Sequence, residues 1–381
     1  MRYQIYLGAM LTVLIVSVTN CSAQKISTVA SAKTYGKIIE IAKISEARAT
    51  HSATLLANGK VLIAGGMERN GVFFNTADIF DPQTNTFALA KGKMSSKRSG
   101  HSATLLADGR VLMTGGWASG DAPDISAEIY DSQTETFKAT GNMNFRRSGH
   151  TATLLASGKV LITGGSSSGE DALSEAEVFD PQTGAFTRIE KMQSARLGHT
   201  ATVLADGKIL LAGGFGKGNQ TLSSAEIFDW QTNKFSLLKN QMTITRYKHD
   251  AILLKDGRVL VWGGSDNRDW RGQYKSAEIF NPKTGEFTAT GEMSYTRFKV
   301  DGTSVLLKDG KVFIGGGGEA AEVFDPQTNS FTKTEGNFGM PLHFASVTLL
   351  ADGRALVVGG YGNGSRETGP VSTNRSWIFK L

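Results

Sequence analysis

Five copies of an Arg-x-x-His motif are the residues of this 381-residue chain best suited to chemistry. A guanidinium group binds carboxylates and phosphates through paired hydrogen bonds, and an imidazole is a common metal ligand. The motif therefore offers either a grip for acidic ligands or a ring of metal ligands. The five copies are Arg48/His51, Arg98/His101, Arg147/His150, Arg196/His199 and Arg246/His249.

The spacing of the histidines favours a structural role. Each histidine falls once in a repeated unit, so the five lie around an axis and do not converge on one ion. We expect each to be neutral or to be partnered within its own repeat by an acidic residue that recurs downstream. These acidic residues are Asp78, Glu128, Glu177, Glu226 and Glu278.

The repeated unit is marked by a diglycine that occurs seven times at intervals of 44 to 52 residues, a period typical of a propeller, solenoid or array. Each unit is predicted to form four short strands. Between the first two strands lies an Asn-Gly, Asp-Gly or Ser-Gly pair, which favours a type I′ hairpin turn. The diglycines begin at Gly65, Gly115, Gly164, Gly213, Gly263, Gly315 and Gly359.

Residue size along each unit predicts an all-β, seven-bladed propeller with four-stranded antiparallel blades. The first strand carries small residues, the second Val, Leu and Ile, and the last two Phe and Tyr, as the wedge shape of a blade requires. The last unit ends at its third strand, and the segment after Gly36 aligns with a fourth strand. We therefore expect Lys37–Ile41 to complete blade 7 beside Trp377–Lys380.

These repeats resemble those of the Kelch β-propellers over residues 37–381, although Phe stands at most positions where that family often has Tyr or Trp. Kelch propellers serve mainly as binding platforms, and some hold acidic ligands with arginines near the channel mouth. The resemblance therefore implies a ligand-binding role for Arg48, Arg98, Arg147, Arg196 and Arg246, with salt bridges between blades as the alternative.

The loops between the second and third strands vary in sequence and share one face of the ring, where binding usually resides. Their aromatic and arginine residues are candidate anchors for a protein or a glycan, or else fold down to plug the channel. Blades 6 and 7 carry Gly302 and Ala345 at the aligned histidine position, which points to divergence there. The candidate anchors are Phe73, Trp117, Phe215, Trp270, Arg271, Tyr274 and Tyr361.

The N-terminal 23 residues resemble a secretory signal, with Arg2 before an apolar stretch over residues 5–18. Cys21, the only cysteine, either becomes a lipidated first residue or precedes cleavage after Ala23. Residues 24–36 would then form a flexible tether. These features predict export, to the cell envelope or beyond, with membrane attachment only through a lipid.

The remaining patterns favour a monomeric binding module. A net charge of +6 without a basic run gives no nucleic-acid site. The copper-radical oxidases among Kelch proteins need a cysteine inside the propeller, which this chain lacks, and we expect neither cofactor nor metal. We assign no catalytic residues. The alternative is a carbohydrate-active enzyme of the mutarotase or epimerase type, whose acid–base pair at the channel mouth no motif would reveal.

Overall fold

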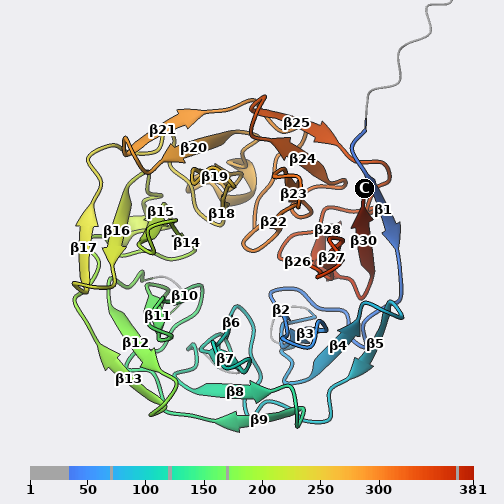
Figure 1. The fold of residues 1–381 in the computed structure, drawn as a ribbon, viewed down its shortest axis with the longest axis horizontal. Coiled ribbons are helices and arrows are strands. Elements are labelled where there is room, and N and C mark those ends of the chain that lie inside the picture. Colours follow the sequence, from blue (N-terminus) through green and yellow to red (C-terminus); the bar gives the residue numbers. More distant parts are fainter. Residues whose placement is uncertain (1–33, 69–71, 119–121, 169–170, 366–368) are drawn as a thin grey trace, which may run out of the picture. The chain divides into compact units, whose positions relative to one another are not determined.

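The computed structural model describes residues 34–68, 72–118, 122–168, 171–365 and 369–381. Residues 34–381 form one compact unit, a closed ring of seven four-stranded antiparallel sheets (Figure 1). This architecture confirms the predicted propeller. The predicted signal, Cys21 and most of the predicted tether lie outside the described residues. Among the described residues, no helix combines the length and the apolar character needed to span a membrane.

Six blades run along the chain from the inner to the outer strand. Blade 1 is β2 (Ser52–Leu55), β3 (Val61–Ala64), β4 (Ala77–Asp81) and β5 (Thr86–Leu89). Blade 2 is β6 (Ser102–Leu105), β7 (Val111–Thr114), β8 (Ala127–Asp131) and β9 (Thr136–Ala139). Blade 3 is β10 (Thr151–Leu154), β11 (Val160–Thr163), β12 (Ala176–Asp180) and β13 (Ala185–Arg188).

The next three blades repeat this order. Blade 4 is β14 (Thr200–Val203), β15 (Ile209–Ala212), β16 (Ala225–Asp229) and β17 (Lys234–Leu237), with the short helix η1 (Lys217–Asn219) in its variable loop. Blade 5 is β18 (Asp250–Leu253), β19 (Val259–Trp262), β20 (Ala277–Asn281) and β21 (Glu286–Ala289), with η2 (Asp269–Arg271) in the equivalent loop. Blade 6 is β22 (Ser304–Leu306), β23 (Val312–Ile314), β24 (Glu322–Asp325) and β25 (Ser330–Lys333).

Blade 7 joins the two ends of the described chain and closes the ring, as predicted. Its order is β26 (Ser346–Leu349), β27 (Ala355–Val358), β30 (Ser376–Lys380) and β1 (Lys37–Glu40) (Figure 1). Lys37 pairs with Lys380 and Glu40 with Trp377. An additional hairpin, β28 (Tyr361–Ser365) and β29 (Gly369–Ser372), forms within the last variable loop.

The described propeller begins before the predicted boundary. The backbone N–H of Tyr35 donates to the carbonyl of Lys333 in blade 6, and its hydroxyl donates to Asp309. The last residues of the predicted tether therefore belong to the ring.

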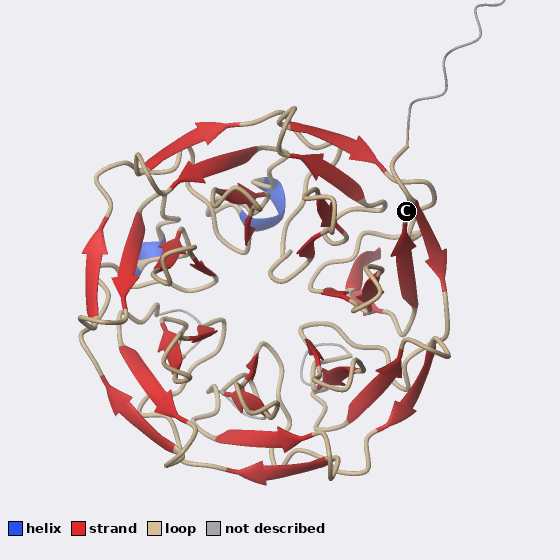
Figure 2. Ribbon diagram, viewed as in Figure 1, coloured by secondary structure: helices blue, strands red, loops and turns tan. Residues whose placement is uncertain are grey.

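The hydrophobic core lies between adjacent blades. The second strands are buried throughout, as in Val61–Ala64, whereas the fourth strands, which form the rim in Figure 2, are largely exposed. Leu62 of blade 1 packs in one cluster with Val111 and Met113 of blade 2. Each blade thus buries its faces against its neighbours, and the stack makes a rigid platform around the channel.

The hairpin turns differ from the predicted type I′. At Asn58-Gly59, only the glycine has a positive φ, of 81°. The N–H of Gly59 donates to the carbonyl of Leu56, and the N–H of Leu56 donates to the carbonyl of Lys60. This is a three-residue loop, a type I turn followed by a left-handed glycine, which needs one positive φ and not two.

Candidate functional site

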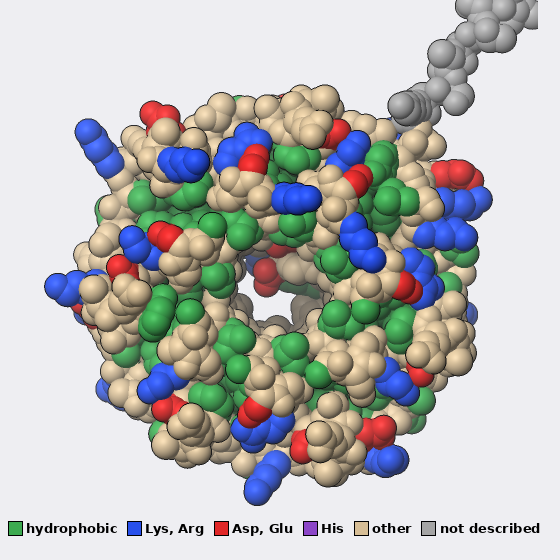
Figure 3. All heavy atoms as spheres, viewed as in Figure 1, with side chains coloured by type: hydrophobic (Ala, Val, Ile, Leu, Met, Phe, Trp, Pro, Cys, Tyr) green, Lys and Arg blue, Asp and Glu red, His purple; other side chains and the backbone are tan. Residues whose placement is uncertain are grey.

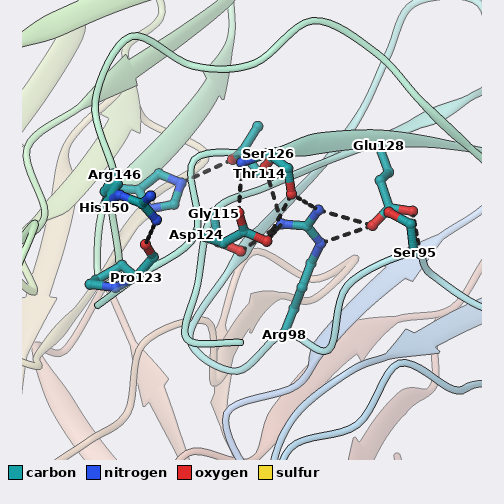
Figure 4. A network of polar contacts seen from close by, with 10 residues as sticks. All are labelled: Ser95, Arg98, Thr114, Gly115, Pro123, Asp124, Ser126, Glu128, Arg146 and His150. Atoms are coloured by element: carbon teal, nitrogen blue, oxygen red, sulfur yellow. Dashed lines mark hydrogen bonds and ion pairs between the residues drawn. The ribbon is translucent and has the colours of Figure 1, made fainter. Parts of the chain in front are cut away.

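The side chains of the motif arginines are buried and connect strands within their own blades. We refer to them as struts. In Figure 4, Arg98 donates from Nε and Nη2 to Oε1 of Glu128 at 3.2 and 2.9 Å, and from Nη1 to the carbonyl of Gly115 at 2.9 Å. Its side chain has no solvent exposure. Equivalent buried pairs join Arg48 to Asp78, Arg147 to Glu177, Arg196 to Glu226, Arg246 to Glu278 and Arg297 to Glu322.

This geometry corrects two expectations. The carboxylates pair with the arginines, so the predicted histidine–acid pairs do not form. The arginine side chains bridge strands of one blade, not two blades, and none of the five reaches the channel surface where a ligand would bind. A sixth arginine, Arg297, forms the equivalent buried pair in blade 6, where no histidine follows it.

The histidines instead link neighbouring blades. His51 Nε2 lies 2.8 Å from the hydroxyl of Ser346 in blade 7, and His101 Nε2 lies 2.9 Å from that of Ser52 in blade 1. Burial lowers the pKa of His51, His101 and His199 to about 3, so these rings are neutral at neutral pH. The expectation of neutral structural histidines is confirmed, but their partners are hydroxyl groups.

A closed ring of seven backbone hydrogen bonds surrounds the channel mouth, with one residue from each blade. Each residue donates its N–H to the carbonyl of the equivalent residue in the preceding blade, at 2.7 to 3.3 Å, and each has a positive φ between 49° and 63°. The ring residues are Thr50, Gly100, Gly149, Gly198, Lys248, Lys299 and Phe344.

The composition of this ring is asymmetric. Blades 2 to 4 have glycine, which adopts a positive φ without strain, but the other four blades have larger residues. A non-glycine residue in this conformation costs about 1–2 kcal/mol, and such strain is concentrated at functional sites. Thr50, Lys248, Lys299 and Phe344 therefore mark one side of the mouth as the candidate site.

A cavity of about 550 Å³ occupies the channel mouth beside this ring. Met67, Phe73, Trp117 and Leu197 supply apolar walls from blades 1 to 4, and the ring glycines leave that side open. Figure 3 shows the channel open along its axis. The channel is therefore not plugged by its loop aromatics.

An aromatic cluster surrounds the two ring lysines across blades 4 to 7. Phe215 packs on Tyr247 at 5.4 Å between ring centroids, and Tyr247 packs on Phe298 at 5.8 Å. Trp270 lies edge-on to Phe298 at 5.7 Å and is within 6.3 Å of Tyr361. Loop aromatics predicted as anchors thus pack into one cluster at the mouth, in which Phe298 and Tyr361 are buried and Trp270 is exposed.

Two carboxylates lie in the channel below the mouth. Asp250 accepts hydrogen bonds from the N–H of Thr303 at 3.1 Å and the hydroxyl of Ser304 at 2.7 Å. Burial, and then the nearby charge of Asp301, raise the pKa of Asp250 to about 7. Asp301 lines both the mouth and the channel interior, where it is exposed to the channel, and the surrounding channel wall raises its pKa as well.

A family model of the KLHDC2/KLHL20/DRC7 Kelch-repeats domain matches residues 29–214 and 124–317, which together span well over half of the chain. The chain belongs to this Kelch-repeat family. No curated protein matches it in sequence.

Among solved structures, a fungal alcohol oxidase of the AA5 family, in complex with copper, shares the fold with a TM-score of 0.66 and 17% identity, over 92% of this chain and 76% of the oxidase chain. The described residues of this Kelch propeller include no group of three His, Cys, Asp or Glu residues placed to hold a metal ion.

The seven loop residues predicted as anchors do not converge on one site. Phe73 and Trp117 line the cavity, whereas Phe215, Trp270 and Tyr361 belong to the aromatic cluster. Tyr274 lies against the Arg246 guanidinium at 5.5 Å, and Arg271 is exposed.

Sequence reasoning missed Lys248, Lys299, Phe344 and Asp301. A signal was present in the chain, because the glycine of Arg-x-Gly-His in blades 2 to 4 is a lysine in blade 5.

The alignment of blade 6 also needs correction. Val300 follows the ring residue Lys299 as His249 follows Lys248, and Gly302 belongs to an added turn, Asp301-Gly302. This turn places Asp301 in the channel.

Proposed function

We propose that this Kelch propeller is a binding module that receives an apolar side chain of a partner protein segment in its mouth cavity. The observation that carries the proposal is the 550 Å³ cavity at the centre of a rigid ring, lined by Met67, Phe73, Trp117 and Leu197. A concave apolar site with few charged groups is typical of a pre-formed binding pocket. Kelch-repeat membership supports this proposal.

The chemistry of the lining favours a protein segment over a glycan. Sugar hydroxyls need several amide and carboxylate partners, but Asp301 is the only carboxylate among the described lining residues and none of them is an amide. Lys248 adds one cation at the rim. We also propose, from residues 1–23 alone, that the module acts after export, with or without a lipid on Cys21.

A peptide-display selection against the chain tests this function. We expect enriched peptides to share a large apolar residue. Trp117→Ala should weaken their binding at least tenfold, because a buried aromatic anchor contributes about 2 kcal/mol or more. Trp230→Ala is the matched control, since Trp230 lies beside the Gly207 turn on the opposite face and should leave binding unchanged.

Equal binding by wild type and Trp117→Ala would contradict the cavity as the binding site. Failure to enrich peptides, together with binding to a glycan array, would replace the protein segment by a glycan.

The alternative is a carbohydrate-active enzyme at the channel mouth, and the Asp250–Asp301 pair favours it. An acid with a pKa near 7 is suited to proton transfer at neutral pH. However, Asp250 accepts hydrogen bonds from blade 6 at a junction where no motif histidine forms a link, which gives it a structural role.

A further inference from the structure

Lys299 has surroundings unlike those of an ordinary surface lysine. Its side chain is 8% exposed, and its Nζ lies 4.1 Å from the Trp270 ring centroid and 5.1 Å from that of Phe298. Tyr361 Oη accepts a hydrogen bond from Nζ at 2.9 Å. Among the described residues, no carboxylate lies within ion-pair distance of Lys299.

A second cation lies beside it. The N–H of Lys299 donates to the carbonyl of Lys248, and Nζ of Lys248 lies 5.4 Å from the same Phe298 ring centroid. Asp269 lies 3.6 Å from Lys248 and accepts a hydrogen bond from Tyr247. The nearest carboxylate is thus committed to Lys248, while Lys299 is desolvated and next to a like charge.

Both conditions favour the neutral amine over the ammonium ion. Burial first, and then the charge of Lys248, lower the pKa of Lys299 to about 8. At neutral pH the free-amine fraction of this side chain is therefore larger than that of an ordinary surface lysine, although the Trp270 ring, 4.1 Å from Nζ, stabilises the ammonium form. Desolvation and a neighbouring cation are the two means by which proteins activate lysine as a nucleophile.

Lys299 lies next to the mouth cavity without lining it. Phe344 lines that cavity, and its ring centroid lies 5.7 Å from Nζ. The amine is therefore separated from the cavity by one aromatic side chain. We propose that Lys299 is a covalent site for an apolar aldehyde or ketone that enters through the mouth.

The reaction is an imine condensation without a redox step. The neutral Nζ attacks the carbonyl carbon, the C–N bond forms, and the carbonyl oxygen takes up a proton as the nitrogen loses one. The hydroxyl takes up a second proton from solvent, the C–O bond breaks and water leaves, and the resulting iminium returns its remaining nitrogen proton to solvent to give the neutral imine. The Tyr361 hydroxyl, already hydrogen-bonded to Nζ, is placed to orient the amine.

Reductive trapping tests this proposal on the full chain. The protein is incubated with benzaldehyde and cyanoborohydride at pH 7, and the modified lysines are located and timed by peptide mass spectrometry. We expect Lys299 to be labelled at least tenfold faster than Lys91, whose side chain is 79% exposed. The rate at Lys299 should rise with pH through an apparent pKa of about 8.

Two variants test separately whether the aldehyde can reach Lys299 and whether the Lys299 amine is activated. Lys248→Arg keeps the neighbouring cation and removes its amine, so labelling of Lys299 should persist. Phe344→Gly suits the positive φ, opens the path from the cavity, and should accelerate labelling.

Labelling of Lys299 no faster than Lys91 in the wild type and in Phe344→Gly would overturn the proposal. Since the readout is a covalent mass change, it does not depend on whether the mouth binds a protein segment.

The titratable groups around Lys299 come from two neighbouring blades. Blade 5 contributes Tyr247, Lys248 and Asp269, and blade 7 contributes His343 and Tyr361. Burial lowers the pKa of His343, so among these groups Lys248 is the cation whose removal matters most. Lys248→Met should raise the pKa of Lys299 and slow its labelling at pH 7.

Discussion

Removal of a single buried arginine strut should destabilise the propeller far more than removal of an exposed arginine. Arg98→Met leaves the Glu128 carboxylate buried, with the Ser95 N–H as its remaining hydrogen-bond donor (Figure 4). An uncompensated buried charge of this kind costs about 3–5 kcal/mol. The carbonyls of Gly115 and Ser126 also lose the Nη1 donor, which adds about 1–3 kcal/mol.

A double-mutant cycle separates these contributions. Glu128→Leu alone leaves the guanidinium with only the more distant Asp124 carboxylate, 3.8 Å away, and should cost about 3 kcal/mol. The double variant, Arg98→Met with Glu128→Leu, removes both charges and retains only the carbonyl penalty. Its cost should fall below the sum of the single costs by about 6–8 kcal/mol, because both penalties for an uncompensated buried charge are absent.

The assay is equilibrium urea unfolding, followed by tryptophan fluorescence and by far-ultraviolet circular dichroism, with coincident curves required. Arg110→Met is the matched control, since Arg110 pairs with Asp108 at 2.6 Å but the two side chains are 37% and 46% exposed. An exposed pair contributes about 0–1 kcal/mol. A cost for Arg98→Met no greater than that for Arg110→Met would refute the strut interpretation.

The remaining predictions concern protonation. His101 has a pKa of about 3 in the folded chain and about 6.5 when unfolded, so its contribution to stability is complete above pH 6.5 and is lost as the pH falls towards 3. The stability advantage of the wild type over His101→Gln should therefore shrink by about 1.4 kcal/mol per pH unit between pH 6 and 4, measured by urea unfolding; a constant difference would mean that His101 is not neutral. For the enzyme alternative, exchange spectroscopy of reducing sugars should show the same anomer exchange with wild type and with Asp301→Asn. Acceleration that depends on Asp301 would establish catalysis in its place.

The fold could be predicted from the sequence because the residue types in each repeat determine how its four strands pack. Small, then aliphatic, then aromatic residues in each unit can pack only as a wedge, and the orphan strand Lys37–Glu40 had one unpaired edge to join. The turn type was predicted wrongly because Asp-Gly suits both a type I′ turn and a three-residue loop with one left-handed glycine. Which of the two forms depends on the register of the flanking strands.

The site was harder to predict because the same pattern serves two opposite purposes. A recurring arginine beside a channel can either bind an acidic ligand or act as a strut. Only the structure decides between the two roles, as in the burial of Arg98 against Glu128. The aromatic cluster depends on contacts between loops of different blades, such as Trp270 with Tyr361. No spacing in the chain specifies those contacts.

Departures from the repeat are more informative about function than the repeat itself. The struts recur in blades 1 to 6 and the histidine links in blades 1 to 5, where they hold the scaffold together, so they do not distinguish one ligand from another. The seven-residue ring is common to all blades, yet glycine would satisfy its backbone at every position. Lys248, Lys299 and Phe344 instead occupy consecutive blades at a cost of about 1–2 kcal/mol each. Since the ring needs none of these side chains, their strain is the observation that directs the search for function to this side of the mouth.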